Sequence, residues 1–191
     1  MMLKKTFVSL LFILSVFSLL RAQEIGVKTN SLHWATLSPN LGIEIALSKK
    51  ITLDISGGFN PFKLSGEKYL NHWIVQPEAR YWLCEPFNGH FFGVHLLGGQ
   101  FNIGNVNIPI GRLKTFKDAR YEGNAWGGGF TYGHQWMFAS RWGIEAAIGA
   151  GYVYLDYNKF PCGNCGTKLA TDVKHYLGVT KAAISVIYFI K

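Results

Sequence analysis

Beyond its first twenty-odd residues, the chain has no apolar run long enough to cross a membrane as a helix. Charged or polar residues interrupt every later hydrophobic stretch, whereas a spanning helix needs about 20 consecutive apolar residues. Helical windows with capping residues are also missing from the mature part of the sequence. Any membrane span must therefore be built from strands.

The first 22 residues have the features of a secretory signal peptide. Lys4 and Lys5 give a positive start, an apolar stretch runs over residues 7–20, and Ala22 offers a small residue at the cleavage point. A membrane anchor is the alternative, but this stretch is shorter than the ~20 residues that a spanning helix needs. We therefore expect a mature domain of residues 23–191. Its formal charge is +5, because the signal carries three basic residues and no acidic one.

Alternation of apolar with small or polar residues runs through most of the mature chain, and it indicates β-strands with two unlike faces. Eight segments show this pattern, at about residues 26–34, 41–47, 51–56, 73–81, 92–97, 126–138, 142–154 and 181–188. The connections at 48–50, 84–89 and 139–141 are short, whereas those at about 35–39, 60–72, 102–121 and 158–177 are mostly long. Short and long connections therefore alternate, and both termini fall on the side of the short ones.

This layout is typical of outer-membrane barrels, whose short turns face the periplasm. A soluble barrel of the lipocalin type is the alternative. Membrane insertion is favoured by strands of about nine to eleven residues and by a second face that is too charged for a greasy ligand. It is also favoured by aromatic residues near the strand ends of the apolar face, namely Trp73, Tyr81, Trp136, Trp142, Tyr152, Tyr154 and Tyr188. We predict an all-β fold, an eight-stranded antiparallel transmembrane β-barrel in the outer membrane with periplasmic termini.

The polar face of the predicted strands places charged side chains inside the barrel. These residues are Lys28, Glu44, Asp54, Glu78, Arg80, Glu145 and Lys181. Buried charges require partners, and four acids facing three bases can pair almost completely. An eight-stranded barrel is just filled by its side chains, and glycines at 127, 129, 149 and 151 would make room for the larger groups. We expect a structural plug of salt bridges and no wide pore.

Several segments resemble a known family. They are VKTN at 27–30, PNLGIE at 39–44, LDISGG at 53–58, HWIVQPEARYWLC at 72–84, FNGHFFG at 87–93 and TKAA at 180–183. Together they resemble an uncharacterised family of outer-membrane barrel proteins of Gram-negative gut anaerobes, domain of unknown function 3575. The resemblance covers nearly the whole mature chain. It implies the barrel fold and the outer-membrane location, and it transfers no catalytic residues.

Cysteine is scarce, with three residues in the chain. Cys162 and Cys165 are close together in a long connection, whereas Cys84 is in a short connection at the opposite end of the predicted barrel. With three cysteines, one thiol is left without a partner in the chain. We expect a disulfide between Cys162 and Cys165 that closes a loop. A redox pair is one alternative, but no helix follows to lower a thiol pKa. Zinc is another, although it needs two further ligands, for which His175 and Asp172 are the candidates.

Positive charge gathers in the second, third and fourth long connections. Their net charges are +1, +3 and +2, which together exceed the +5 of the mature chain. Lysine and arginine form charge-assisted hydrogen bonds with phosphate, so lipopolysaccharide and outer-membrane lipid are the expected partners. A solvated rim without a specific ligand is the alternative. The residues concerned are Lys63, Lys68, Arg112, Lys114, Lys117, Arg120, Lys159, Lys168 and Lys174.

The six histidines are scattered along the chain and form no catalytic motif. A hydrolase would need a serine or carboxylate beside one of them. His95 could meet Glu78, but we expect a structural role for it. The sequence favours a non-enzymatic outer-membrane barrel with an envelope-structural or surface-interaction role through its basic loops. A lipid A-modifying enzyme and a narrow channel or transport accessory are the alternatives. We expect no cofactor, no bound metal and no nucleic-acid partner.

Overall fold

The computed structural model describes residues 24–61, 63–64, 68–104, 119–161 and 168–190. In these ranges the chain is all-β apart from the short helix α2, Ser31–Ala35. The strands are β1 Ile25–Asn30, β2 Asn40–Ala46, β3 Ile51–Asn60, β4 Lys63–Leu64, β5 Lys68–Trp82, β6 Gly89–Gly104, β7 Arg120–Ala139, β8 Trp142–Phe160 and β9 Ala170–Ile190. The predicted signal peptide, residues 1–22, lies outside the described residues. No helix in the described ranges has the length and apolarity to span a membrane.

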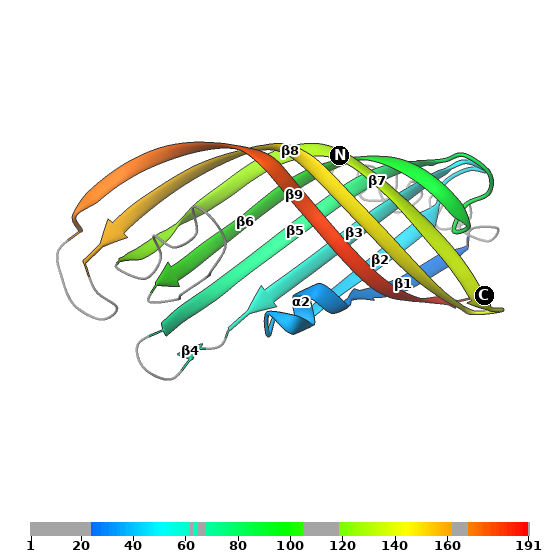
Figure 1. Cartoon of the computed structure of the whole chain (residues 1–191), viewed down its shortest axis with the longest axis horizontal. Coiled ribbons are helices and arrows are strands. Elements are labelled where there is room, and N and C mark those ends of the chain that lie inside the picture. The colour runs from blue at the N-terminus through cyan, green and yellow to red at the C-terminus, as the bar shows by residue number, and fades with distance from the viewer. Residues whose placement is uncertain (1–23, 62, 65–67, 105–118, 162–167, 191) are drawn as a thin grey trace, which may run out of the picture.

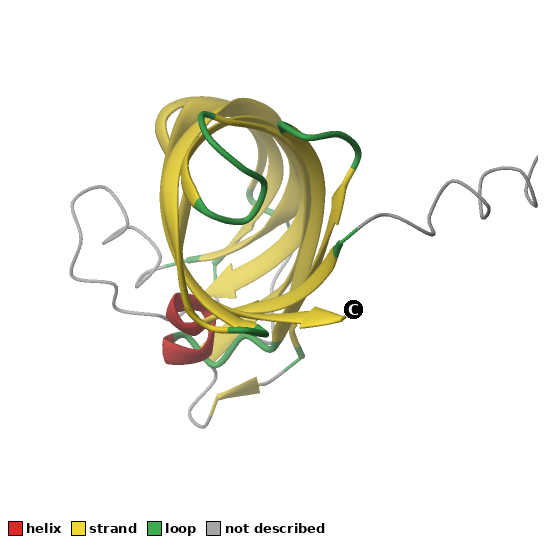
Figure 2. Cartoon of the chain, turned by 90° about the vertical axis from the view of Figure 1, so that its right-hand side faces the viewer, coloured by secondary structure: helices red, strands yellow, loops and turns green. Residues whose placement is uncertain are grey.

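The strands form one antiparallel sheet that closes on itself. Its order is β3-β2-β1-β9-β8-β7-β6-β5, and β5 pairs again with β3. Seen from one end, the strands form a ring (Figure 2). Within the described residues the ring has eight strands, and β4 is a two-residue addition beside the start of β5. The prediction of eight antiparallel strands is confirmed.

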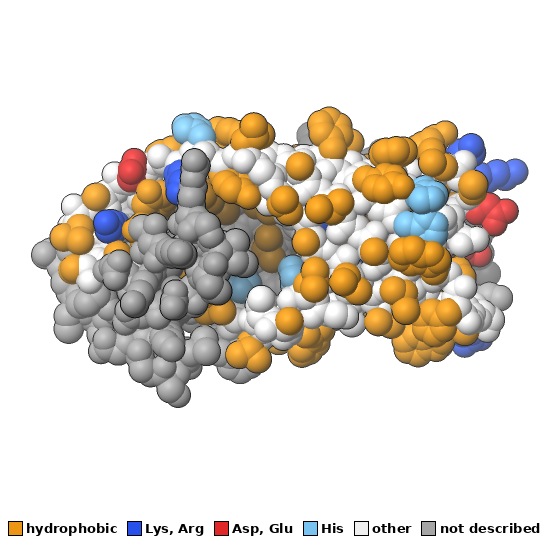
Figure 3. Space-filling model, viewed as in Figure 1, with side chains coloured by type: hydrophobic (Ala, Val, Ile, Leu, Met, Phe, Trp, Pro, Cys, Tyr) orange, Lys and Arg blue, Asp and Glu red, His pale blue; other side chains and the backbone are white. Residues whose placement is uncertain are grey.

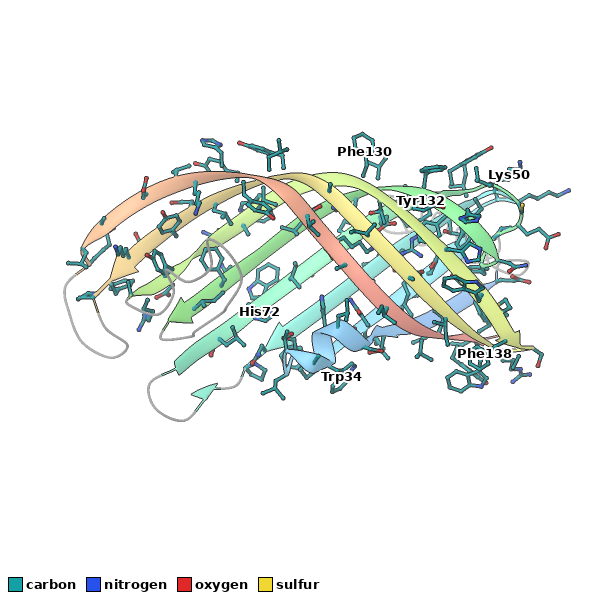
Figure 4. All side chains as sticks on the ribbon, viewed as in Figure 1. Trp34, Lys50, His72, Phe130, Tyr132 and Phe138 are labelled. Atoms are coloured by element: carbon teal, nitrogen blue, oxygen red, sulfur yellow. The ribbon has the colours of Figure 1, made fainter. Side chains whose placement is uncertain are left out.

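The inner and outer faces of the ring differ in chemistry. On β2 and β3, Glu44 and Asp54 point inward and are fully buried, whereas Ile43 and Ile55 are exposed on the outside. The same alternation continues on the longer strands, where Phe130 and Phe138 project away from the ring (Figure 4). The outer face is therefore apolar, and the inner face carries the buried charged side chains.

Both described chain ends lie at one end of the ring. Ile25 pairs with Ile190 in the β1–β9 ladder, and the short connections at 47–50, 83–88 and 140–141 lie at this same end. Lys50 marks it in Figure 4. We call it the short-turn end and the opposite one the loop end.

The first strand is shorter than the sequence predicts. It was expected to reach residue 34, but it ends at Asn30, where the chain turns into α2. The Asn30 side chain accepts a hydrogen bond from the backbone N–H of Leu32 at 3.1 Å. Asparagine is among the preferred residues for this capping position, so the helix replaces the last part of the predicted strand.

The strands at the loop end extend into segments predicted as connections. Pairing reaches Gly104 on β6 and begins at Arg120 on β7 and Ala170 on β9, so the predicted loop bounds of 102–121 and 158–177 were wrong, as was the bound of 60–72 beside β5. In this region the outer face becomes polar, as at Asn102, which pairs with Glu122. The backbone ladder continues where the hydrophobic alternation stops, and alternation alone cannot detect that.

The wall of the ring is uneven in height. β1 and β2 have 6 and 7 residues, whereas β9 has 21. β9 pairs with β1 only from Ser185 onward, so its earlier residues pair with β8 alone. On the loop-end side of β1 and β2 a stretch of the wall is therefore missing, and we call this gap the step. Helix α2 lies at the step, close to β9 (Figure 1).

Candidate functional site

Arg80 lies at the centre of a buried charge network inside the ring. Its guanidinium contacts four carboxylates: Nη1 lies 2.8 Å from Glu44 and 2.6 Å from Glu145, Nη2 lies 3.1 Å from Asp54, and Nε lies 3.0 Å from Glu78. All five side chains are almost completely buried. The planar guanidinium, with its five N–H donors, can bond acids that project from four different strands.

Two lysines complete this network. Lys28 Nζ lies 2.8 Å from Glu44, 3.0 Å from Asp54 and 3.5 Å from Glu145. Lys181 pairs with Glu78 and lies 3.6 Å from Asp54. The structure thus brings together all seven charged residues that the sequence placed inside the ring. They come from six strands, so the network connects most of the wall through its interior.

Aromatic rings pack next to the network, toward the short-turn end. The Trp82 and Phe91 ring centroids lie 4.8 Å apart, and the Phe87 and Phe189 centroids lie 5.1 Å apart. The Arg80 guanidinium lies 4.3 Å from the Phe91 centroid. All four aromatic residues are buried. Phe87 adopts a φ of 63°, which is unusual for a bulky residue. Its ring packs against Phe189 in the interior near the short-turn end, and this packing stabilises the conformation.

His95 occupies the interior on the other side of the network. Its Nδ1 lies 2.8 Å from Thr131 Oγ1, and its Nε2 lies 2.9 Å from Thr180 Oγ1. It is paired across the ladder with Glu78, but its hydrogen bonds go to the two threonines. Gly149 provides the space, since a Cβ there would lie 3.0 Å from the His95 ring. The surroundings of His95 are those of a structural residue.

An apolar cavity of about 670 Å³ lies in the loop-end half of the ring. Inward-facing side chains of β5, β6, β7 and β8 line it, and Ala35 to Leu37 border it at the step. Its apolar lining includes Leu37, Leu70, Ile74, Leu97, Phe101 and Leu155. No motif in the sequence marks this cavity, although its lining follows the same alternation that places the charges inside.

A serine–histidine contact lies beside this cavity. Ser38 Oγ is 3.3 Å from His72 Nε2, and His72 Nδ1 is 3.2 Å from the Leu70 carbonyl oxygen. Ser38 is only 1% exposed, and its hydroxyl also lies 3.2 Å from the Thr36 carbonyl. A nucleophile must reach its substrate, so this buried hydroxyl serves to fasten the 36–39 segment to β5.

The basic residues expected in the loops are distributed over strands and connections. Lys63 and Lys68 lie in β4 and β5, Arg120 and Lys159 in β7 and β8, and Lys174 in β9, so the prediction of loops at these positions was wrong. Arg120 pairs with Glu122 at 2.7 Å, and the Lys159 ammonium lies 5.9 Å from the Tyr121 ring centroid. Lys168 and Lys174 are exposed. Arg112, Lys114 and Lys117 lie outside the described residues.

The predicted disulfide between Cys162 and Cys165 also lies outside the described residues. Cys84 is exposed in the connection between β5 and β6, at the short-turn end. Of the alternative zinc ligands, His175 contacts the Tyr152 hydroxyl through its Nδ1. In the described part of the chain, no group of three or more histidine, cysteine or acidic side chains is arranged to hold a metal ion.

These features define a class: an all-β protein with a closed antiparallel ring, an apolar outer face and an ion-paired interior. The family model described as protein of unknown function (DUF3575) matches residues 7–190. The chain therefore belongs to this family, and the resemblance to domain of unknown function 3575 is confirmed. A comparison with curated proteins finds no match.

Proposed function

We propose that this protein is an eight-stranded β-barrel of the bacterial outer membrane, with its termini in the periplasm and its loop end outside the cell. It acts there as a membrane-anchored scaffold with an envelope-structural or surface-interaction role. The observation that carries this proposal is the apolar outer face, bounded by two rows of aromatic side chains. Exposed residues at these rows include Trp73, Trp126, Tyr152 and Tyr154 toward the loop end, and Tyr81, Trp136 and Trp142 toward the short-turn end.

The distance between the two aromatic rows fits a bilayer. Trp126 and Trp136 are ten residues apart on β7, and Trp142 and Tyr152 are ten apart on β8. Ten strand residues span about 33 Å. At a tilt of about 40°, typical of such barrels, they rise about 25 Å, which is the usual height of the lipid-facing band. Between the rows the outer face carries residues such as Phe130 and Ile148, which are exposed and apolar.

The filled interior favours a scaffold over a channel. Arg80 and its four acidic partners occupy the middle of the ring, and the aromatic cluster around Trp82 packs toward the short-turn end. Ions would have to displace buried, mutually paired charges to pass, and breaking such pairs is costly. Outside the membrane, exposed lysines such as Lys168 and Lys174 are available for lipopolysaccharide phosphates, which we propose as the polar partner of this surface.

A charge placed at mid-height on the outer face tests the membrane assignment. Phe130→Arg should lower the free energy of unfolding by about 2–4 kcal/mol, because arginine is costly at the bilayer midplane. The matched control is Asn124→Arg on the same strand and face, beyond the Trp126 row, where the cost should be about 0–1 kcal/mol. Urea unfolding of the protein in lipid vesicles measures both. Equal losses for the two variants would contradict a lipid-facing position for Phe130.

Cell fractionation tests the location itself. The full chain, expressed in a Gram-negative host, should be recovered in the outer membrane and should migrate faster on a gel before boiling than after it. Cys162→Ser should leave this behaviour unchanged, because the described strand ladders that close the ring do not include residue 162. Recovery in a soluble fraction, or a mobility that boiling does not alter, would overturn the proposal.

A further inference from the structure

We propose that the apolar cavity in the loop-end half of the ring binds one acyl chain of a lipid, which reaches it through the step between α2 and β9. This inference rests on the proposed function, because it places the step beside the outer leaflet. It goes further by assigning the protein a ligand of defined chemistry. The proposal depends on three observations: the composition of the cavity, its opening and its height in the ring.

The composition of the cavity suits a hydrocarbon. Its volume of about 670 Å³ lies within the ~300–1,000 Å³ of small-molecule sites, which are lined mainly by apolar side chains. The polar side chains of the lining are already bonded within the protein. His72 contacts Ser38 and the Leu70 carbonyl, Thr36 donates to the His33 carbonyl at 2.9 Å, and Gln100 accepts from Trp73 Nε1 at 3.0 Å. Ordered water needs two to four polar partners. An apolar chain needs none, so it is the occupant that this lining favours.

The step gives an acyl chain a lateral route into the cavity. From Ile184 back to Ala170, β9 has no strand partner on its β1 side within the described residues. Ala35, Thr36 and Leu37 border the cavity at this opening, and Leu32, Trp34 and Leu37 expose apolar surface around it. The molecular surface is hollowed in this region (Figure 3), and Trp34 projects outward from α2 (Figure 4). Among the described residues, an acyl chain can thus pass from the outside of the wall to its interior without crossing a paired strand.

The cavity also lies at the same height in the ring as the aromatic row toward the loop end. Gly99 and Ala125 face each other across the β6–β7 ladder and both line the cavity. Trp126 follows Ala125 directly and points outward, and Trp73 borders the cavity from β5. Aromatic rows mark the membrane–water boundary. An acyl chain entering at the step would therefore come from the outer leaflet and keep its polar end near that boundary.

Two leucines on one strand provide a matched pair of variants. Leu97 is 9% exposed and points into the cavity, whereas Leu96 is 63% exposed and points away from the ring. The folded full chain, purified in octyl glucoside, is incubated with palmitic acid or with palmitoyl lysophosphatidylglycerol, and retained lipid is measured by native mass spectrometry. Wild type and Leu96→Trp should each retain one molecule. Leu97→Trp should retain about tenfold less, because the larger indole would fill part of the cavity that the acyl chain needs.

The two lipids distinguish the source of the chain. Retention of palmitic acid alone indicates a free fatty acid, and retention of the lysolipid alone indicates a lipid with a phosphate head group; both outcomes support the proposal. Equal retention by wild type and Leu97→Trp, or none by wild type, overturns it. Gel mobility before boiling verifies that each variant is folded, and Ala125→Leu replaces Leu97→Trp if the latter is not. A wild type that fractionates to the outer membrane but retains no lipid refutes the ligand and leaves the proposed function standing.

Discussion

Replacing Arg80 with alanine is expected to lower the free energy of unfolding by about 3–5 kcal/mol, or to prevent folding altogether. The guanidinium contacts Glu44, Asp54, Glu78 and Glu145 inside the ring. Without it, four buried carboxylates would share two lysines. Removal of one partner from a buried ion pair leaves a charge that neither water nor protein compensates, and this is more costly than losing the attraction alone.

The matched control is Arg120→Ala. Arg120 pairs with Glu122, which is half exposed at the loop end, and pairs of this kind contribute about 0–1 kcal/mol. Arg80→Lys should fall between the two, because lysine restores the charge but cannot bond four acids with one planar fork. Urea unfolding in vesicles, followed by tryptophan fluorescence and gel mobility, gives all three values. A loss for Arg80→Ala no larger than that for Arg120→Ala would show that the network does not hold the strands together.

Gly151→Ala is expected to destabilise the ring by about 3 kcal/mol, at the upper end for a single added methyl in a packed interior. A Cβ at this position would lie 2.1 Å from the Gly128 carbonyl oxygen and 2.5 Å from the Gly129 Cα. Both are backbone atoms of the adjacent strand, so relief requires β7 and β8 to move apart. The glycines thus allow two strand backbones to approach closely, besides giving space to side chains.

Gly57→Ala on β3 provides the comparison. The nearest atom to a Cβ at Gly57 is the Ile74 carbonyl oxygen at 3.6 Å, and its backbone needs no left-handed conformation. This substitution should change the free energy of unfolding by less than about 1 kcal/mol, with a slight gain from reduced freedom of the unfolded chain. Unfolding in vesicles measures both variants. Equal midpoints would mean that the close approach at Gly151 relaxes freely.

The sequence predicts the ring and its charges because both depend on a period of two residues. Once Leu41 and Ile43 are assigned to the outside, Glu44 must point inward. The same alternation, applied within each of their own strands, places Asp54, Arg80 and Lys181 in the interior. Trp82 obeys this rule as well, since it follows Arg80 by two residues. Its place in the aromatic cluster could therefore have been predicted from the same pattern.

Other parts of the structure leave no such trace in the sequence. Helix α2 depends on one capping side chain, that of Asn30, in a segment that otherwise fits a strand. The Ser38–His72 contact joins residues 34 positions apart, and neither belongs to a motif. The step exists because β9 is much longer than β1. The early part of β9 lacks the alternation of apolar and polar residues, so the sequence does not reveal its length. The cavity behind the step could therefore be recognised only in three dimensions.

The charge network has a consequence for the order in which the chain folds. Several of its ion pairs are long-range: Glu78 and Lys181 are 103 residues apart, and Arg80 and Glu145 are 65 apart. Contacts of this separation make folding slow, since chain entropy is lost before they form. Lys28 lies on β1, which pairs with its neighbour β2 in the chain and closes the ring by pairing with β9. We therefore expect the interior carboxylates to keep their water until β1 and β9 close the ring, and the loss of this water to be part of the barrier to closure.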